Sequence, residues 1–206
     1  MNKRHRPIAN LGGYLLDRVR LSRGHPINLH GYLKFVVLRE LRQRTAARCL
    51  IETGTFLGVT AARCARVFGR VFTIELDPRL ARDARRHLRD YPNVEVFEGD
   101  AAEWLPRILA REDAREAVVF LDAHHSGGET ARGDVPEPAI IELEAMSPFR
   151  DRICGIVVDD FRLFGAEPGF PTKAELVSAA EGLFRHPGFE LKAHADQLIV
   201  ERRRSS

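Results

Sequence analysis

The stretch that decides the fold reads Cys49-Leu50-Ile51-Glu52-Thr53-Gly54-Thr55-Phe56-Leu57-Gly58-Val59-Thr60. Its apolar start predicts a buried strand, and its two glycines lead from that strand into a helix-like segment. A short loop of this kind aims free backbone N–H groups and the positive end of the helix dipole at one point, where a carboxylate or phosphate is favoured. Gly54 permits the tight bend, while Gly58 lets the helix approach a neighbour or a ligand closely. The stretch therefore predicts a turn that holds a nucleotide-like cofactor.

The same residues exclude two common cofactor motifs. A dinucleotide fingerprint needs a glycine where Phe56 stands, so the close approach of a pyrophosphate to the backbone is obstructed. A phosphate-binding P-loop needs Gly-Lys-Ser/Thr at its end, but Val59 follows Gly58. NAD and ATP bound in these ways are therefore disfavoured.

Apolar β-like runs alternate with helical patterns after an N-terminal region with a helix expected around Leu33 to Gln43. This alternation predicts an α/β fold with a doubly wound, mainly parallel sheet covered on both faces. Two further runs near the C-terminus are joined through His194-Ala195-Asp196 and predict a hairpin. The seven expected strands are Cys49–Glu52, Val71–Glu75, Val94–Glu98, Val118–Leu121, Gly155–Val158, Phe189–Ala193 and Gln197–Glu201.

Three helices carry start signals in the sequence. Asp77 can cap a helix that begins at Pro78. The pairs Asp100 with Glu103 and Thr172 with Glu175 have the spacing of a capping box, in which each residue bonds the other's backbone. These signals predict helices directly after the second, third and fifth strands.

The Glu52-Thr53-Gly54 turn with Gly58 resembles the first motif of the class I S-adenosylmethionine-dependent methyltransferases. The aromatic Phe56, with threonines close by, is most similar to the catechol and caffeoyl-CoA O-methyltransferase branch. A terminal hairpin is what that fold adds to its parallel sheet, so the resemblance spans roughly residues 45–201. An ordinary glycine-containing turn is the plain alternative.

The resemblance implies a set of S-adenosylmethionine contacts. Glu52 is expected near the ammonium group of the methionine part. Glu75 closes the second strand 23 positions later and is expected to hold the ribose. Asp100 is expected near the adenine, although helix capping alone would also explain it. The full expected set is Glu52, Gly54, Thr55, Gly58, Glu75, Leu76, Asp100, Ala101 and Asp122.

Three carboxylates follow the fourth and fifth strands. Asp122 ends one strand, and Asp159 and Asp160 end the other, so all three can converge at the carboxyl edge of the sheet. Hard oxygen donors suit Mg²⁺ or a similar divalent cation, and the metal-dependent O-methyltransferases have acids in these places. The plain alternative is that Asp122 contacts cofactor or substrate while the other two cap the following loop.

One position departs from that branch. Its members carry a catalytic lysine three residues after the first metal-binding acid, and this chain has His125 there. Histidine is a competent general base near neutral pH, so His125 is expected to take the proton, with Asp122 beside it as a catalytic residue. His124 is an alternative base, and simple solvent exposure of both is the plain reading. The irregular loop that follows, residues 126–136, is a candidate lid or specificity element.

The composition fits one globular domain. The chain has 206 residues, of which 44% are hydrophobic and 30% charged, and a net charge of +3. Cys49, Cys64 and Cys154 lie in apolar settings and are expected to be reduced core residues. No apolar run approaches the roughly 20 residues needed to span a membrane, and the basic start lacks the apolar stretch of a signal peptide. We therefore expect a cytoplasmic protein with no membrane partner.

The N-terminal segment, residues 1–44, is basic and is expected to cover the site in front of a methyltransferase domain of residues 45–206. It is read as a solvated arm, or as a contact for an acidic partner. It could also swap onto a neighbouring copy, so a homo-oligomer is left open. Nucleic acid is not expected as a partner, because the basic residues lack the aromatic interleaving of a stacking surface.

The sequence therefore predicts an O-methyltransferase that transfers a methyl group from S-adenosylmethionine to a hydroxyl of a small molecule, assisted by Mg²⁺ or a similar divalent cation. The segment Asp159-Asp160-Phe161-Arg162-Leu163-Phe164-Gly165 also resembles bacterial methyltransferase-like proteins of sugar pathways, which implies a sugar or glycan acceptor. Two alternatives remain: a metal-independent methyltransferase, and a non-catalytic S-adenosylmethionine-binding regulatory module.

Overall fold

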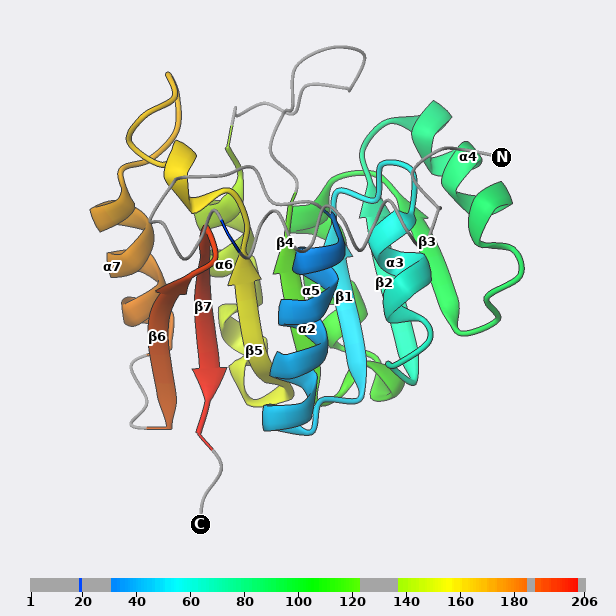
Figure 1. Ribbon diagram of the computed structural model, residues 1–206, viewed down its shortest axis with the longest axis horizontal. Helices are drawn as coiled ribbons and strands as arrows, with labels where there is room; N and C mark the ends of the chain where they lie inside the picture. The colour runs from blue at the N-terminus through cyan, green and yellow to red at the C-terminus, as the bar shows by residue number, and fades with distance from the viewer. Residues whose placement is uncertain (1–18, 20–30, 123–136, 185–187, 204–206) are drawn as a thin grey trace.

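The computed structural model describes residue 19 and residues 31–122, 137–184 and 188–203. Within these residues lies one seven-stranded sheet in the order β3-β2-β1-β4-β5-β7-β6 (Figure 1). Strands β1 to β5 are parallel, and β7 is antiparallel to β5 and β6. The strands are β1 (Cys49–Thr53), β2 (Arg70–Glu75), β3 (Val94–Glu98), β4 (Ala117–Leu121), β5 (Ile153–Val158), β6 (Phe189–His194) and β7 (Gln197–Arg202).

Helices cover both faces of this sheet, which explains why its central strands are apolar on both sides. Helices α2 to α4 pack on one face, where Leu50 is buried, and α5 to α7 pack on the other, where Ile51 is buried. Figure 1 shows α2 in front of the sheet with its first turn toward the tip of β4. The helices are α2 (Gly31–Thr45), α3 (Val59–Cys64), α4 (Pro78–Leu88), α5 (Ala101–Leu109), α6 (Ala139–Met146) and α7 (Lys173–Leu183).

The predicted fold class and strands are confirmed, with ends that differ by two residues or fewer. The helix expected around Leu33 to Gln43 is α2, which extends two residues further at each end. Its Leu38 and Leu41 are fully buried in the core. The three cysteines are free and buried, as predicted.

The helix caps are confirmed, apart from one detail. The Asp77 side chain accepts bonds from the backbone at the start of α4, where Pro78 is the first residue. Thr172 and Glu175 form the full capping box of α7. Asp100 caps α5 by accepting a bond from the Ala102 N–H at 2.7 Å. Asp100 thus bonds the backbone of Ala102 and not that of Glu103, so the predicted capping box is replaced by a simple cap.

The turn after β1 needs both of its glycines. Gly54 has φ +80° and Gly58 has φ +68°, a region that other residues rarely adopt. A Cβ at Gly58 would also lie only 2.9 Å from Cδ1 of Leu88 in α4. The close approach predicted for this glycine is therefore an approach between α3 and α4. It fixes the start of α3 next to the carboxyl end of β1.

The C-terminal hairpin inserts its last strand into the sheet, because β7 lies between β5 and the edge strand β6. His194 pairs with Gln197, so the turn itself consists of Ala195 and Asp196, both with positive φ. Such a two-residue turn matches the twist of the strands it joins. The hairpin thereby brings Asp196 and Gln197 beside the end of β5, where Val158 pairs with Leu198.

Candidate active site

The carboxyl edge of the sheet has its switch point between β1 and β4, where the strand order reverses. Ligands of open α/β sheets bind outside the carboxyl ends of the strands at such a point. The glycine turn, Asp122 and the acids after β5 all lie at this edge. The predicted convergence of these groups is therefore present in the structure.

Glu52 at the end of β1 is buried and belongs to a short chain of hydrogen bonds. The Thr73 hydroxyl donates to Glu52 Oε2 at 2.7 Å, and the hydroxyls of Thr55 and Thr73 are also 2.7 Å apart. Burial raises the pKa of Glu52 to about 8, although the bond from Thr73 acts in the opposite direction. With this pKa the Glu52 carboxyl group loses its proton only at about pH 8. A positive charge beside it would favour the ionised form.

Glu75 at the end of β2 is held rigidly by the backbone. Its Oε2 accepts a bond from the Phe56 N–H at 2.7 Å, and its Oε1 accepts one from the Asp77 N–H at 3.0 Å. A carboxylate oxygen can accept two bonds, so each still has capacity for a ligand hydroxyl. Phe56 itself is 47% exposed above the turn. Glu75 therefore ties the glycine turn to the end of β2.

The remaining expected cofactor residues lie at the ends of β2 and β3. Leu76 and Ala101 are half-buried, and Asp100 is exposed at the start of α5. Gly99 links β3 to this cap with φ +133°. These three residues therefore occupy the edge beside Glu75, as the sheet order requires.

Asp122, Asp159 and Asp160 form a three-carboxylate cluster. One oxygen from each lies within 4.8 Å of the others. Sheet register explains the meeting, because the Asp159 N–H donates to the Leu121 carbonyl at 3.0 Å and so sets the two strand ends side by side. Three oxygens at these separations can surround a divalent cation.

Lys34 was not predicted, and it lies in this cluster. Its Nζ is 3.1 Å from Oδ2 of Asp122 and also pairs with Oδ2 of Asp159. Burial alone would lower the pKa of the Lys34 ammonium, but the negative charges of Asp122, Asp159 and Asp160 outweigh it and raise that pKa. The Lys34 side chain is only 13% exposed. A charged ammonium therefore lies among the acids expected to bind a metal.

The sequence did contain a signal for Lys34. On α2 it shares a face with Val37, Leu38 and Leu41, all of which are buried. A lysine within an apolar stripe needs an ionic partner. Because helical side chains lean toward the N-terminus, its ammonium extends from the first turn of α2 to the carboxyl edge of the sheet.

The second acid after β5 has a partner of its own. Arg162 Nη1 lies 2.5 Å from Oδ1 of Asp160 and also pairs with Oδ2 of Asp196 in the hairpin turn. Gln197 donates from Nε2 to Oδ1 of Asp159 at 2.9 Å. The hairpin thus positions both acids. The cap of the following loop that the plain alternative expected is not made by the Asp160 side chain, which forms no capping bond at the start of the turn at Phe161–Leu163.

Glu142 is a further buried acid that the sequence did not single out. It lies on α6, and its Oε2 accepts a bond from the Thr53 hydroxyl at 3.1 Å. The Thr53 backbone carbonyl in turn accepts a bond from the Asp122 N–H. Burial, reinforced by the charge of Glu137, raises the pKa of Glu142 to about 8. Glu142 therefore supports the end of β1 from the opposite face of the sheet.

The two histidines expected near the acids, His124 and His125, lie outside the described residues, as does the loop that follows them. Their role as a general base stays a prediction. Asp122 is the last described residue before them and remains part of the cluster.

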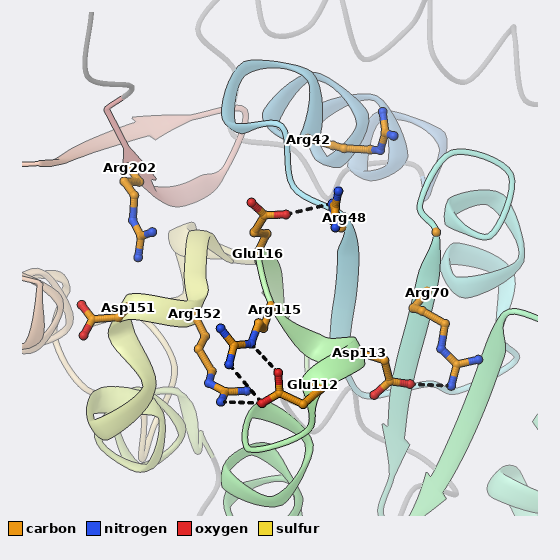
Figure 2. Close-up of a pocket in the computed structure, with 11 residues that line it drawn as sticks. Arg42, Arg48, Arg70, Glu112, Asp113, Arg115, Glu116, Asp151, Arg152 and Arg202 are labelled. Atoms are coloured by element: carbon orange, nitrogen blue, oxygen red, sulfur yellow. Dashed lines mark hydrogen bonds and ion pairs between the residues drawn. The ribbon is translucent and has the colours of Figure 1, made fainter.

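A hollow of about 820 Å³ lies at the opposite edge, where the parallel strands begin (Figure 2). Its charges pair with one another: Arg48 with Glu116 at 3.0 Å, and Arg70 with Asp113 at 3.0 Å. Figure 2 shows these pairs in the hollow, together with two arginines that share Glu112. The hollow is lined by Arg42, Arg48, Gly69, Arg70, Glu112, Asp113, Arg115, Glu116, Asp151, Arg152 and Arg202.

None of the helices in the described ranges has the length and apolar character that crossing a bilayer requires.

Comparison with known proteins gives relatives that are named as methyltransferases of several kinds. No family model matches the chain. A transmembrane O-methyltransferase homolog of Mus musculus is 29% identical over 147 residues, which cover 68% of this chain and 54% of that protein. The transmembrane O-methyltransferase of Homo sapiens is 26% identical over 174 residues, which cover 81% and 57%. The chain therefore matches just over half the length of these relatives.

Solved structures agree with this relationship. The O-methyltransferase of Bacillus cereus in complex with S-adenosylhomocysteine has a TM-score of 0.62 at 18% identity, covering 97% of this chain and 92% of that one. Because the sequence identity is low, this structural similarity by itself shows the fold alone. The chain therefore has the fold of the class I S-adenosylmethionine-dependent methyltransferases and is similar in sequence to O-methyltransferases.

Proposed function

We propose that the chain transfers a methyl group from S-adenosylmethionine to a hydroxyl oxygen of a small molecule. The observation that carries this proposal is the gathering of the Asp122, Asp159 and Asp160 carboxylates within 4.8 Å, at the same sheet edge as the glycine turn. The relatives among O-methyltransferases support the reaction class. The hydroxylated acceptor, with a sugar or glycan as the narrower proposal, rests on the sequence resemblance.

The cofactor is proposed to lie over the turn between Gly54 and Gly58. Glu75 has spare acceptor capacity on both oxygens for the ribose hydroxyls. Glu52, with its raised pKa, ionises most easily when a cation such as the ammonium group of the methionine part lies beside it. Thr55, Leu76, Asp100, Ala101 and Asp122 complete the proposed lining.

The proposed reaction is a direct displacement that needs alignment more than covalent help from the protein. The acceptor oxygen forms a bond to the methyl carbon as the bond from that carbon to the sulfonium sulfur breaks, and S-adenosylhomocysteine leaves. The hydroxyl proton passes to a base. His125 is proposed as that base, with His124 as its alternative, and Asp122 is proposed to border the reacting oxygen.

A divalent cation such as Mg²⁺ is proposed at the three-carboxylate cluster. The donor set fits, because three carboxylate oxygens within 4.8 Å are hard ligands that such a cation prefers. When bound there, a divalent cation supplies charge that lowers the pKa of an acceptor hydroxyl. Asp159 and Asp160 would be held in place for it by Gln197 and Arg162.

The N-terminal segment of residues 1–44 is proposed to cover this site. Its described helix, α2, already brings Lys34 to the cluster. The same segment could cover the site of a second copy, so the proposal leaves room for a homo-oligomer.

The test is calorimetric titration with S-adenosylmethionine and S-adenosylhomocysteine, with and without Mg²⁺, followed by transfer of a labelled methyl group to a panel of hydroxylated acceptors that includes sugars. We expect micromolar binding of both compounds and label on an acceptor oxygen. Binding of neither compound would overturn the proposal. Turnover that a chelator leaves unchanged would reject the metal, and binding without turnover on any acceptor would favour a regulatory module.

A further inference from the structure

The Lys34 ammonium occupies the position in the three-carboxylate cluster that the proposed divalent cation would take. The ammonium pairs with Asp122 at 3.1 and 3.3 Å and with Asp159, and these are two of the three residues proposed to bind the metal. A metal ion bound to the same oxygens would lie within contact distance of that nitrogen. The two cations therefore exclude each other on both steric and electrostatic grounds.

The cluster requires a positive charge in either case. The Asp159 side chain is 1% exposed and the Asp122 side chain is 18% exposed, so water screens them poorly. Arg162 is directed to Asp160 and Asp196. Among the described residues, Lys34 is thus the cation that pairs with both Asp122 and Asp159.

Displacement of the ammonium would require only the Lys34 side chain to move. Leu38 and Leu41 hold α2 in the core, one and two turns further along the helix. The four-carbon stem of Lys34 has several rotatable bonds, so its ammonium can move to solvent while the helix stays in place. Lysine also suits such exchange better than arginine, which would bind carboxylates through two parallel bonds.

We infer that Lys34 is a built-in counter-cation of the cluster, and that a divalent cation binds Asp122, Asp159 and Asp160 only by displacing the Lys34 ammonium. This inference rests on the metal part of the proposed function. Its consequence is that the affinity for metal is set in part by α2, an element of the N-terminal segment rather than of the strand ends. Metal binding would release a positively charged side chain beside the site.

The first experiment measures the affinity for Mg²⁺ and Mn²⁺ of the full chain, without cofactor, in the wild type and in Lys34→Met. Losing a competitor should tighten binding by about 5- to 150-fold, the usual range of coupling between two ligands. Lys34→Arg should bind metal no better than the wild type. Lys192→Met is the matched control, because Lys192 pairs with Glu201 on the hairpin, and its affinity should equal that of the wild type.

The second experiment uses the wild-type chain and does not depend on the folding of a variant. The sequence has only four lysines, so ¹³C-labelled lysine gives few side-chain NMR signals. Loss of one signal in Lys34→Arg assigns Lys34. Titration with Mg²⁺ should move that signal to the position of an exposed lysine and leave Lys192 unchanged.

Equal metal affinities in the wild type and Lys34→Met would overturn the inference, as would a Lys34 signal that stays fixed while metal binds. Failure of both proteins to bind metal would also overturn it. Binding of S-adenosylhomocysteine is measured in the same samples. If that binding persists while metal affinities are equal or the Lys34 signal stays fixed, only the counter-cation role is lost. If it persists while neither protein binds metal, a methyltransferase without metal remains.

Discussion

At the carboxyl edge of the sheet the paired charges are buried, whereas at the amino edge they lie open to solvent. The Asp159 side chain is 1% exposed, but those of Arg48 and Glu116 are 82% and 55% exposed. Exposed pairs contribute about 0–1 kcal/mol each, while breaking a buried pair leaves an uncompensated charge that costs several times more. The comparison indicates that charges at the amino edge contribute solubility and modest stability, whereas those at the carboxyl edge are buried where the proposed ligands would bind.

The largest expected difference between the edges comes from Asp159→Asn. It removes one charge from the cluster at nearly constant size, so turnover on an accepted hydroxyl substrate should fall by at least about a hundredfold through lost alignment. Steady-state kinetics and titration with S-adenosylhomocysteine check this, and cofactor affinity should stay close to that of the wild type. Asp113→Asn at the amino edge is the control. Equal loss of turnover in both variants would break the comparison.

Glu75→Gln tests the cofactor side of the carboxyl edge. Bonds from ribose hydroxyls to an ionised carboxylate are charge-assisted, so their weakening should raise the dissociation constant of S-adenosylhomocysteine by about ten- to a hundredfold. Glu98→Gln, at the end of the neighbouring strand, carries an exposed side chain that pairs with Arg85 and serves as the control. Calorimetry that finds equal affinities in Glu75→Gln and the wild type would remove Glu75 from the site.

Glu142→Gln tests how a buried acid near the carboxyl edge makes the stability of the folded chain depend on pH. The pKa of Glu142 is about 8 in the folded chain, against about 4.5 ordinarily. The unfolded chain therefore loses this proton first, and Glu142 makes the wild type less stable as pH rises from about 4.5 to 8. Glutamine cannot ionise, so the variant should be more stable than the wild type by about 1–3 kcal/mol at pH 8, with little difference at pH 5.

Urea unfolding at the two pH values measures that difference. Glu144→Gln on the same helix is the control, because Glu144 is exposed. Some pH dependence should remain in Glu142→Gln, since the pKa of Glu52 is also raised to about 8. An advantage of the variant that is the same at pH 5 and pH 8 would contradict the burial argument.

The smallest effect is expected at the amino edge. A double-mutant cycle on Arg70 and Asp113, which lie 3.0 Å apart, should give a coupling energy below about 1 kcal/mol that disappears in high salt. Thermal or urea unfolding of the two single variants and the double variant measures it. A large coupling that resists salt would mean that the hollow in Figure 2 is more than a solvated surface.

Local patterns predicted the parts of the molecule that depend on neighbours in the sequence. Alternating apolar runs predicted the strands, and the caps at Asp77 and Thr172 fixed two helix starts. Parallel pairing then placed Asp122, Asp159 and Asp160 together, because strand ends of one sheet share an edge.

The contacts between distant segments were not predicted in the same way. Lys34 meets Asp122 across 88 positions, and this depends on the rotation of α2 about its axis as well as on its pattern. Glu142 meets Thr53 across 89 positions through the packing of α6 beneath β1. The position of Lys34 within an apolar stripe indicates that it has an ionic partner, but the pattern does not identify that partner.

The insertion of β7 between β5 and β6 has a consequence for the order in which the molecule assembles. A chain leaves the ribosome from its amino end, and domains form as their segments emerge. Gln197 and Asp196 complete the supports of Asp159 and Arg162, so the cluster stays unfinished until the last strand has been made. The region proposed for chemistry therefore matures only after β7 has emerged, and a nascent chain that stops before the hairpin has the glycine turn but incomplete support for its acids.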